Sequence, residues 1–253
     1  NNYTDACGIA SLTAAPNTFN CSNVTPSTPT ELFISEYVEG NSNIKYLEIY
    51  NGTASSVNLG NYTLRNYANG STTVTSSNVL SGSLASGAVV VYKNSAATGY
   101  AGTATTLGMM TFNGNDAVAL FNNSTNQFCD IIGNIGDDPG SAWTAPGLST
   151  VDRTLRRKSS VNKGVTIDPA GTGATSFTTL ATEWDGYPTD DVSGLGSHAI
   201  SLGTPVVLTV TDAAAIEASS LFCSKVRKSC SLIFWSLDFS SNSFSSFGVL
   251  RRN

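Results

Sequence analysis

Apolar and polar residues alternate in short runs between residues 31 and 200, with turn-forming residues between the runs. In "KYLEIYN", Leu47 and Ile49 fall on one side of an extended chain. Tyr46, Glu48 and Tyr50 fall on the other side. The preceding run, "ELFISEYVEG", leads into a Gly/Asn turn, so the two runs together predict an antiparallel hairpin.

Further runs of strand length are "NYTLRNY", "GAVVVYKN", "DAVALFN" and "NQFCDIIG". The segments "FNGND" and "FNNSTNQ" are typical of tight turns. Gly contributes 23 residues, and Lys and Glu, which long helices need on their exposed faces, are scarce. The pattern predicts an all-β sandwich or barrel.

The residue composition changes after residue 30 and again after residue 201, which predicts that the chain has three parts. Residues 1–30, with "TPSTPT", are typical of an irregular arm or linker, and residues 31–201 carry the strand pattern. Residues 202–253 form a C-terminal extension. We expect it to hold a strand ("PVVLTVT"), a short helix ("DAAAIEASSLF", with Asp212 as a possible cap) and an apolar, Ser-rich tail.

Charge argues against a nucleic-acid partner. Only 12% of the residues are charged, the net charge is −5 and the sequence pI is about 4.8. Proteins that bind by neutralising phosphates carry a clustered positive surplus, which this chain lacks overall. No run approaches the roughly 18 apolar residues that a transmembrane helix needs.

Cysteine usage and the first residue indicate a secreted, extracellular or cell-surface protein. The chain begins with Asn rather than Met, so we expect a mature chain whose leader has been removed. Five cysteines without a C-x-x-C motif fit an oxidising compartment. Cys7 with Cys21, and Cys223 with Cys230, are candidate disulfides, which leaves Cys129 as a buried core thiol; the sequence alone does not fix the pairing.

Acceptor sequences for N-glycosylation are frequent, which fits a glycoprotein and equally an unglycosylated bacterial protein of this composition. The candidate positions are Asn2, Asn20, Asn23, Asn51, Asn61, Asn69, Asn122 and Asn123.

A basic run, "RTLRRKSS", spans residues 153–160. Strand alternation places Arg153 and Arg157 on one face and Arg156 and Lys158 on the other. We expect these cations to pair with the surplus acids or to lie over apolar surface. Phosphate binding by Arg156, Arg157 and Lys158 is the alternative, because a local basic patch can operate inside an acidic protein.

An acidic run, "EWDGYPTDDVSGLGSH", ends at the single histidine, His198. Trp184, Tyr187 and Pro188 are typical of a packing corner, and the glycines at 186, 194 and 196 are typical of turns. We expect no cofactor. Ca²⁺ held by the aspartates of this run is the alternative, although the EF-hand spacing is absent. The candidate ligands are Asp185, Asp190 and Asp191.

Catalytic signals are missing from the sequence. His198 as a base would need a nucleophile or metal beside it, and neither G-x-S-x-G nor H-E-x-x-H occurs. Glu36, Glu39 and Glu48 lie on or beside the first hairpin, where we expect them to face solvent; two close carboxylates, as in glycosidases, are the alternative. Trp143 in "GSAW" is expected to fill a corner. We therefore expect that the protein is not an enzyme.

Several of these motifs occur together, in order, in a known family. "LFISEYVEGNSNIKYLEIYN", "VNLGNYTLRNY", "FNGNDAVALF", "DIIG", "DDPGSAW", "DRTLRRKSS" and "WDGYPTDDVSGLGSH" resemble the lamin-tail domain, in the variant found in secreted microbial proteins. The resemblance covers about residues 31–200. It implies an immunoglobulin-like β-sandwich and an accessory or interaction role rather than catalysis.

Two functions remain open. The first is a non-catalytic extracellular structural or adhesive protein that assembles with other copies of itself through its terminal arms, as a filament or surface layer. The alternative is an accessory binding module for a secreted nuclease or hydrolase, a polysaccharide or nucleic acid. Glycans are possible partners in either case, whereas nucleic acid is not expected from the charge.

Overall fold

The computed structural model divides the chain into two compact units, and residues 10–13, 18–21, 28–201 and 208–210 are described below. One unit contains β1 (Ala10–Thr13), β2 (Thr18–Cys21) and β17 (Leu208–Val210). These strands form an antiparallel sheet with β2 in the centre. Two strands thus lie in the N-terminal segment that its composition indicated to be irregular. The predicted helix after Asp212 and the tail lie outside the described residues.

The other unit, Thr25–Thr204, holds the segment with the alternating pattern. Its larger sheet has six strands in the order β10-β9-β4-β3-β15-β16. All neighbours are antiparallel except β9 and β10, which are parallel. The strands are β3 (Phe33–Glu39), β4 (Lys45–Tyr50), β9 (Val89–Lys93), β10 (Thr105–Thr106), β15 (Arg153–Arg157) and β16 (Trp184–Tyr187).

The second sheet of this unit has four antiparallel strands in the order β12-β11-β6-β7. They are β6 (Tyr62–Tyr67), β7 (Ser76–Val79), β11 (Ala117–Asn122) and β12 (Gln127–Ile132). Two short ladders, one 3-10 turn and one helical turn complete the unit: β5 (Val57–Asn58) with β8 (Ser83–Leu84), β13 (Thr144–Ala145) with β14 (Leu148–Ser149), η1 (Leu59–Asn61) and α1 (Leu180–Glu183).

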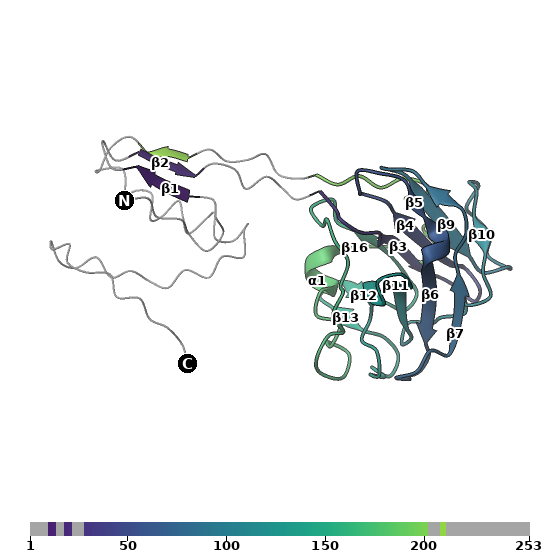
Figure 1. Ribbon diagram of the computed structural model, residues 1–253. Coiled ribbons are helices and arrows are strands. Elements are labelled where there is room, and N and C mark those ends of the chain that lie inside the picture. The colour runs from purple at the N-terminus through teal and green to yellow at the C-terminus, as the bar shows by residue number, and fades with distance from the viewer. Residues whose placement is uncertain (1–9, 14–17, 22–27, 202–207, 211–253) are drawn as a thin grey trace. The chain divides into compact units, whose positions relative to one another are not determined.

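The two sheets pack face to face around one hydrophobic core (Figure 1). Ile34 and Leu47 of the larger sheet and Leu64, Leu120 and Ile131 of the smaller sheet belong to the same buried cluster. Burial of these side chains is the main stabilising contribution, at roughly 25 cal/mol per Å² of apolar surface removed from water. The predicted all-β sandwich and the predicted β3–β4 hairpin are confirmed.

The outer face of the larger sheet is also covered. Residues 188–201, hereafter the covering segment, lie over it, and Leu195 packs with Val38, Tyr46 and Val91 in a second apolar cluster. All six residues of β4 are consequently buried, on both faces of the strand. The expectation that Glu36, Glu39 and Glu48 face solvent is wrong: they are 2%, 3% and 1% exposed.

Candidate functional site

The basic run on β15 is divided between the two faces of the sheet. The Arg157 side chain is fully buried, with its guanidinium 2.5 Å from an Asp130 carboxylate oxygen and 2.6 Å from one of Glu183. Its Nε donates to the Ile34 carbonyl oxygen at 2.8 Å, and its Cζ lies 4.2 Å from the centre of the Trp184 ring. Arg157 therefore holds the core together and is out of reach of a phosphate in solvent.

Arg156 points to the opposite face, under the covering segment. Its Nε lies 3.2 Å from Glu36 Oε1, and its Nη2 donates to Asp191 Oδ1 at 2.8 Å. Its guanidinium lies 3.8 Å from the centre of the Tyr187 ring. Ion pairing and stacking together hold this side chain in place. The prediction that the cations of the basic run pair with acids is confirmed for Arg156.

Lys158 follows at the end of β15 and is half-buried. Its Nζ donates to the carbonyl oxygens of Ala181 and Thr182 at 2.9 and 3.3 Å and lies 4.0 Å from Asp185. Arg156 and Arg157 thus lie on opposite faces of the sheet, and each of the three candidate phosphate ligands already has partners. All three line one open groove, but the Arg157 side chain is fully buried and each cation is already paired.

Two buried carboxylates lie opposite each other beneath the covering segment. Glu36 of β3 is the register partner of Glu48 of β4, next to a bulge in β3. Glu48 accepts hydrogen bonds from Ser35 Oγ at 2.7 Å and from the backbone N–H of Gly196 at 2.6 Å. Burial raises the pKa of Glu36 to about 7, against the opposing effect of Arg156, and burial also raises the pKa of Glu48. The pair can therefore take up a proton near neutral pH.

Gly194 of the covering segment lies directly against the Glu36–Arg156 ion pair. A Cβ atom built there would overlap Arg156 Nε and Glu36 Oε2. Among the three glycines expected in turns, Gly196 has a positive φ, of 100°, and Gly186 lies in β16 beside Leu148. Gly194 lies in the turn at residues 193–196, as predicted, and the close approach to the ion pair leaves no room there for a larger residue.

Gly194→Ala is expected to destabilise the sandwich by about 1–3 kcal/mol, because the extra methyl group must displace the ion pair. Gly108→Ala is the matched control, since the nearest atom to a Cβ there is 4.0 Å away. Urea unfolding followed by tryptophan fluorescence measures both changes. Equal stability of the two variants would show that the covering segment does not press on the ion pair.

His198 lies on the same face, beside two aromatic rings. Its ring centre is 5.7 Å from that of Phe33 and 5.0 Å from that of Tyr50. Its Nε2 is buried and makes no hydrogen bond with the described residues. Burial lowers its pKa to about 4, so the ring is neutral at neutral pH. This geometry joins the imidazole to neither a nucleophile nor a carboxylate.

An open groove of about 340 Å³ runs along this region. Glu36, Arg156, Tyr187 and His198 contribute to its lining. Glu36 Oε1 and Arg156 Nε are buried there as an ion pair without hydrogen-bond geometry, and His198 Nε2 is buried without a hydrogen-bond partner among the described residues. Because these atoms are covered, a bound molecule would not touch them unless the covering segment moved.

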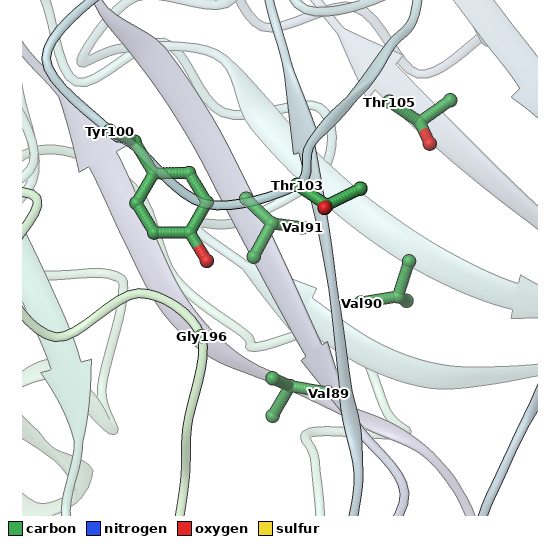
Figure 2. Close-up of a pocket in the computed structure, with 7 residues that line it drawn as sticks. All are labelled: Val89, Val90, Val91, Tyr100, Thr103, Thr105 and Gly196. Carbon is green, nitrogen blue, oxygen red and sulfur yellow. The ribbon is translucent and has the colours of Figure 1, made fainter.

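A second pocket, of about 250 Å³, lies beside β9. Tyr100 and Thr103, from the loop after β9, and the valines of that strand line it (Figure 2). Gly196 of the covering segment reaches its edge. The lining offers methyl groups, hydroxyls and a phenol but no ionised side chain, so it lacks an acid–base pair.

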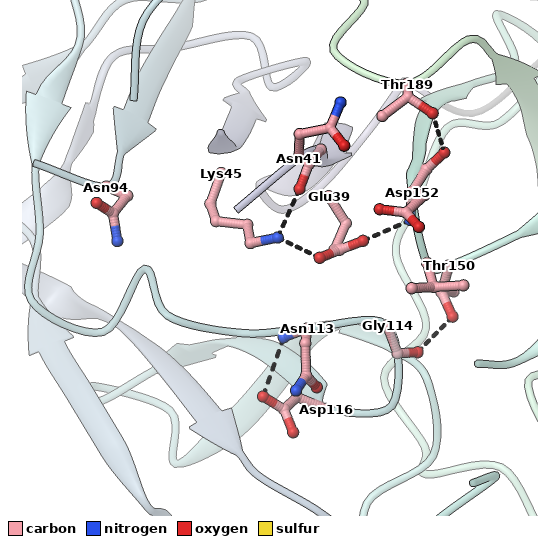
Figure 3. Close-up of polar contacts among 12 residues, drawn as sticks. Glu39, Asn41, Lys45, Asn94, Asn113, Gly114, Asp116, Thr150, Asp152 and Thr189 are labelled. Carbon is pink, nitrogen blue, oxygen red and sulfur yellow. Dashed lines mark hydrogen bonds and ion pairs between the residues drawn. The ribbon is translucent and has the colours of Figure 1, made fainter. Parts of the chain in front are cut away.

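A polar cluster lies at the tip of the β3–β4 hairpin (Figure 3). The buried Lys45 ammonium pairs with Glu39 and donates to the Gly40 carbonyl oxygen at 2.8 Å. The other Glu39 oxygen accepts from the Asp152 backbone N–H at 2.5 Å, and Thr189 Oγ1 donates to the Asp152 carbonyl oxygen. These bonds attach the start of the covering segment to the hairpin, so the cluster has a structural role.

The three aspartates proposed as Ca²⁺ ligands have separate partners. Asp190 accepts hydrogen bonds from the backbone N–H and Nδ2 of Asn41 at 2.8 and 2.7 Å. Asp191 pairs with Arg156, and Asp185 lies beside Lys158. Within the described ranges, no group of three or more His, Cys, Asp or Glu side chains is arranged to hold a metal ion.

The prediction that Cys129 is a buried core thiol is confirmed. Cys129 is buried and unpaired in β12, and burial raises its thiol pKa. The candidate disulfide residues Cys7, Cys223 and Cys230 lie outside the described residues, and Cys21 is described only as part of β2.

The glycosylation candidates differ in access. The Asn51 side chain is fully buried and its Nδ2 donates to the carbonyl oxygens of Ser55 and Leu84, so a glycan there would have to break both bonds. Asn122 is buried and its Nδ2 donates to Glu31. Asn61, Asn69 and Asn123 are exposed. Asn20 lies in β2, and Asn2 and Asn23 lie outside the described residues.

Two structural partners were missed from the sequence. Asp130 and Glu183 hold Arg157, and neither was singled out. A signal existed for Asp130, since a lone acid within the apolar run "FCDIIG" implies a buried partner.

The prediction that Trp143 of "GSAW" fills a corner is confirmed. Trp143 is fully buried, and its Nε1 donates to Ser176 Oγ at 2.8 Å.

A two-layer sandwich whose charged clusters are paired internally defines an interaction or structural module. Residues 25–135 match the family model described as Lamin Tail Domain. This part of the chain is therefore similar to the lamin tail domain, a non-catalytic family with an immunoglobulin-like fold. The match ends before β15 and the covering segment. No curated protein and no solved structure shows a significant match to the chain.

No helix in the described part of the chain is both long enough and apolar enough to cross a membrane.

Proposed function

We propose that this protein is a non-catalytic, extracellular structural or adhesive protein that assembles with copies of itself through its terminal segments. The main support for the proposal is that the charged side chains of the basic and acidic runs pair with one another or with the core instead of lining a reactive site. Arg156 and Arg157, with their acidic partners, fasten the covering segment and the core of the sandwich. A scaffold of this kind suits a load-bearing or adhesive task better than a reaction.

The unit outside the family match supports a role for the termini. Its sheet combines β1 and β2, from the N-terminal part, with β17, from the C-terminal part. β1 and β17 are its outer strands, and each pairs on one side only among the described strands. Outer strands present unpaired backbone groups that readily accept a strand from another copy.

Sedimentation velocity and negative-stain electron microscopy of the full chain test the proposal. We expect oligomers or filaments whose size grows with protein concentration. A chain that stays monomeric at the highest soluble concentration would contradict self-assembly.

An accessory binding module remains the second candidate, and the open groove beside Tyr187 supports it. Because the arginines at this groove are already paired, a neutral polysaccharide fits it better than nucleic acid. Titration with DNA at two salt concentrations separates the partners. Binding that weakens steeply with salt would indicate phosphate contacts, and binding of glucans without DNA binding would support the polysaccharide.

A further inference from the structure

One edge of the smaller sheet is unprotected. β7 is the last strand of that sheet and pairs with β6 only (Figure 1). The backbone N–H of Leu80 donates to the Tyr62 carbonyl oxygen at 2.9 Å. In an antiparallel pair, every second residue bonds to the partner strand. Asn78 and Ser76 therefore direct their backbone groups to β6, as Leu80 does, whereas Ser77 and Val79 direct theirs to the free edge.

The residues around this edge carry none of the usual protection. From 66 to 92 the sequence contains no Asp, Glu, Lys, Arg or Pro. Natural sheets normally guard an exposed edge with charges, prolines or bulges. Val79 is 64% exposed and Val74, just before β7, is 41% exposed. Within the described residues, the one other exposed large apolar side chain is Ile167.

The opposite edge of the same sheet is covered. Beyond β12, the backbone N–H of Val165 donates to Asp130 Oδ1 at 2.8 Å, and Gly164 packs against the Cys129 carbonyl. An incoming strand would have to displace this loop. In the described part of the chain, the loop after β10 hydrogen-bonds at β7 only to the Asn78 side chain, through the Met109 N–H at 2.9 Å, so the backbone groups of Ser77 and Val79 stay available to an added strand.

Charge identifies the partner as a second copy. A contact between two copies related by a two-fold axis places like surfaces together, and in a chain of net charge −5 most surfaces would repel. The uncharged 66–92 stretch avoids that repulsion. Val79, which is exposed within β7, would be covered in such a contact.

We propose that β7 pairs antiparallel with β7 of a second copy, so that two four-stranded sheets become one continuous sheet. This inference rests on the proposed self-assembly and adds a contact made by the sandwich itself. A two-fold contact at β7 and strand addition at the terminal sheet use different strands, so the two contacts can occur in one assembly.

Val79→Lys tests the contact in the full chain. A lysine at this position places two ammonium groups near each other in the pair, and we expect at least a tenfold rise in the dissociation constant measured by sedimentation. Ile167→Lys is the matched control, because it also replaces an exposed apolar residue by lysine but lies outside the edge. At a concentration where the wild type is monomeric, both variants should keep its melting temperature.

Hydrogen exchange gives a second readout. The Ser77 and Val79 amides should become more protected as the wild-type concentration rises, and should stay unprotected in Val79→Lys. If Val79→Lys associates as the wild type does, the β7 contact is refuted while self-assembly through the termini stands. If the wild type is monomeric throughout, both ideas fail.

Discussion

Arg157→Met is expected to lower the free energy of unfolding by about 3–5 kcal/mol, because it removes one partner of a buried ion pair. The Arg157 side chain is fully buried, and the Asp130 carboxylate beside it is equally buried. Removal of the guanidinium leaves Asp130 charged or forces it to take up a proton, and also leaves the Ile34 carbonyl oxygen without its donor. Urea unfolding at neutral pH measures the loss.

Two further variants separate the ion pair from general damage. Arg153→Met, on the same strand but exposed, should change stability by no more than about 0.5 kcal/mol. The double variant Arg157→Met with Asp130→Asn should recover part of the loss, because no charge is then left buried. A small effect of Arg157→Met alone would mean that water reaches Asp130.

Glu36→Gln is expected to change how stability depends on pH. Burial raises the Glu36 pKa from 4.5 to about 7, so between these values the folded state binds more protons than the unfolded state. The contribution of Glu36 to stability is therefore present at low pH and is lost as the pH rises toward 7. At roughly 1.4 kcal/mol per pH unit, the loss amounts to about 3 kcal/mol.

The glutamine side chain is neutral at every pH and cannot show this loss. The stability of Glu36→Gln relative to the wild type should therefore rise by about 3 kcal/mol between pH 4 and pH 8. Denaturant unfolding at half-unit pH steps gives the difference curve. Parallel curves for the two proteins would mean that the Arg156 ion pair keeps Glu36 ionised throughout.

The difference curve is needed because His198 has the opposite effect. Burial lowers its pKa from 6.5 to about 4, so the unfolded state binds more protons in that range and stability falls as the pH falls. His198→Gln should remove the loss on the acid side and leave the Glu36 contribution in place. Glu48, whose pKa is also raised, is unchanged in both variants.

Much of the sandwich was predictable, because strand periodicity is a local property. The alternation in "KYLEIYN" correctly placed Leu47 and Ile49 together in the main core. Alternation in the basic run correctly separated Arg157 from Arg156. The same alternation failed for Glu48, since a polar residue on the second face implied solvent where the structure has a covering layer.

The contacts that define the candidate site were not predictable in this way. Glu48 is bonded to Gly196, 148 positions away, and Arg157 to Asp130, 27 positions away. The turn at Gly194 was predicted correctly, but the sequence does not show which atoms lie against this glycine. Only the assembled sheets bring these groups within reach of one another.

The sequence by itself determined the all-β class and the β3–β4 hairpin, because residue order sets which side chains share a face of a strand. Its motifs also carried the resemblance to the lamin tail domain. The tertiary structure decided which faces are covered and which charges become partners. Those outcomes depend on segments distant in the chain, and their energies arise only when packing removes water from around the charges.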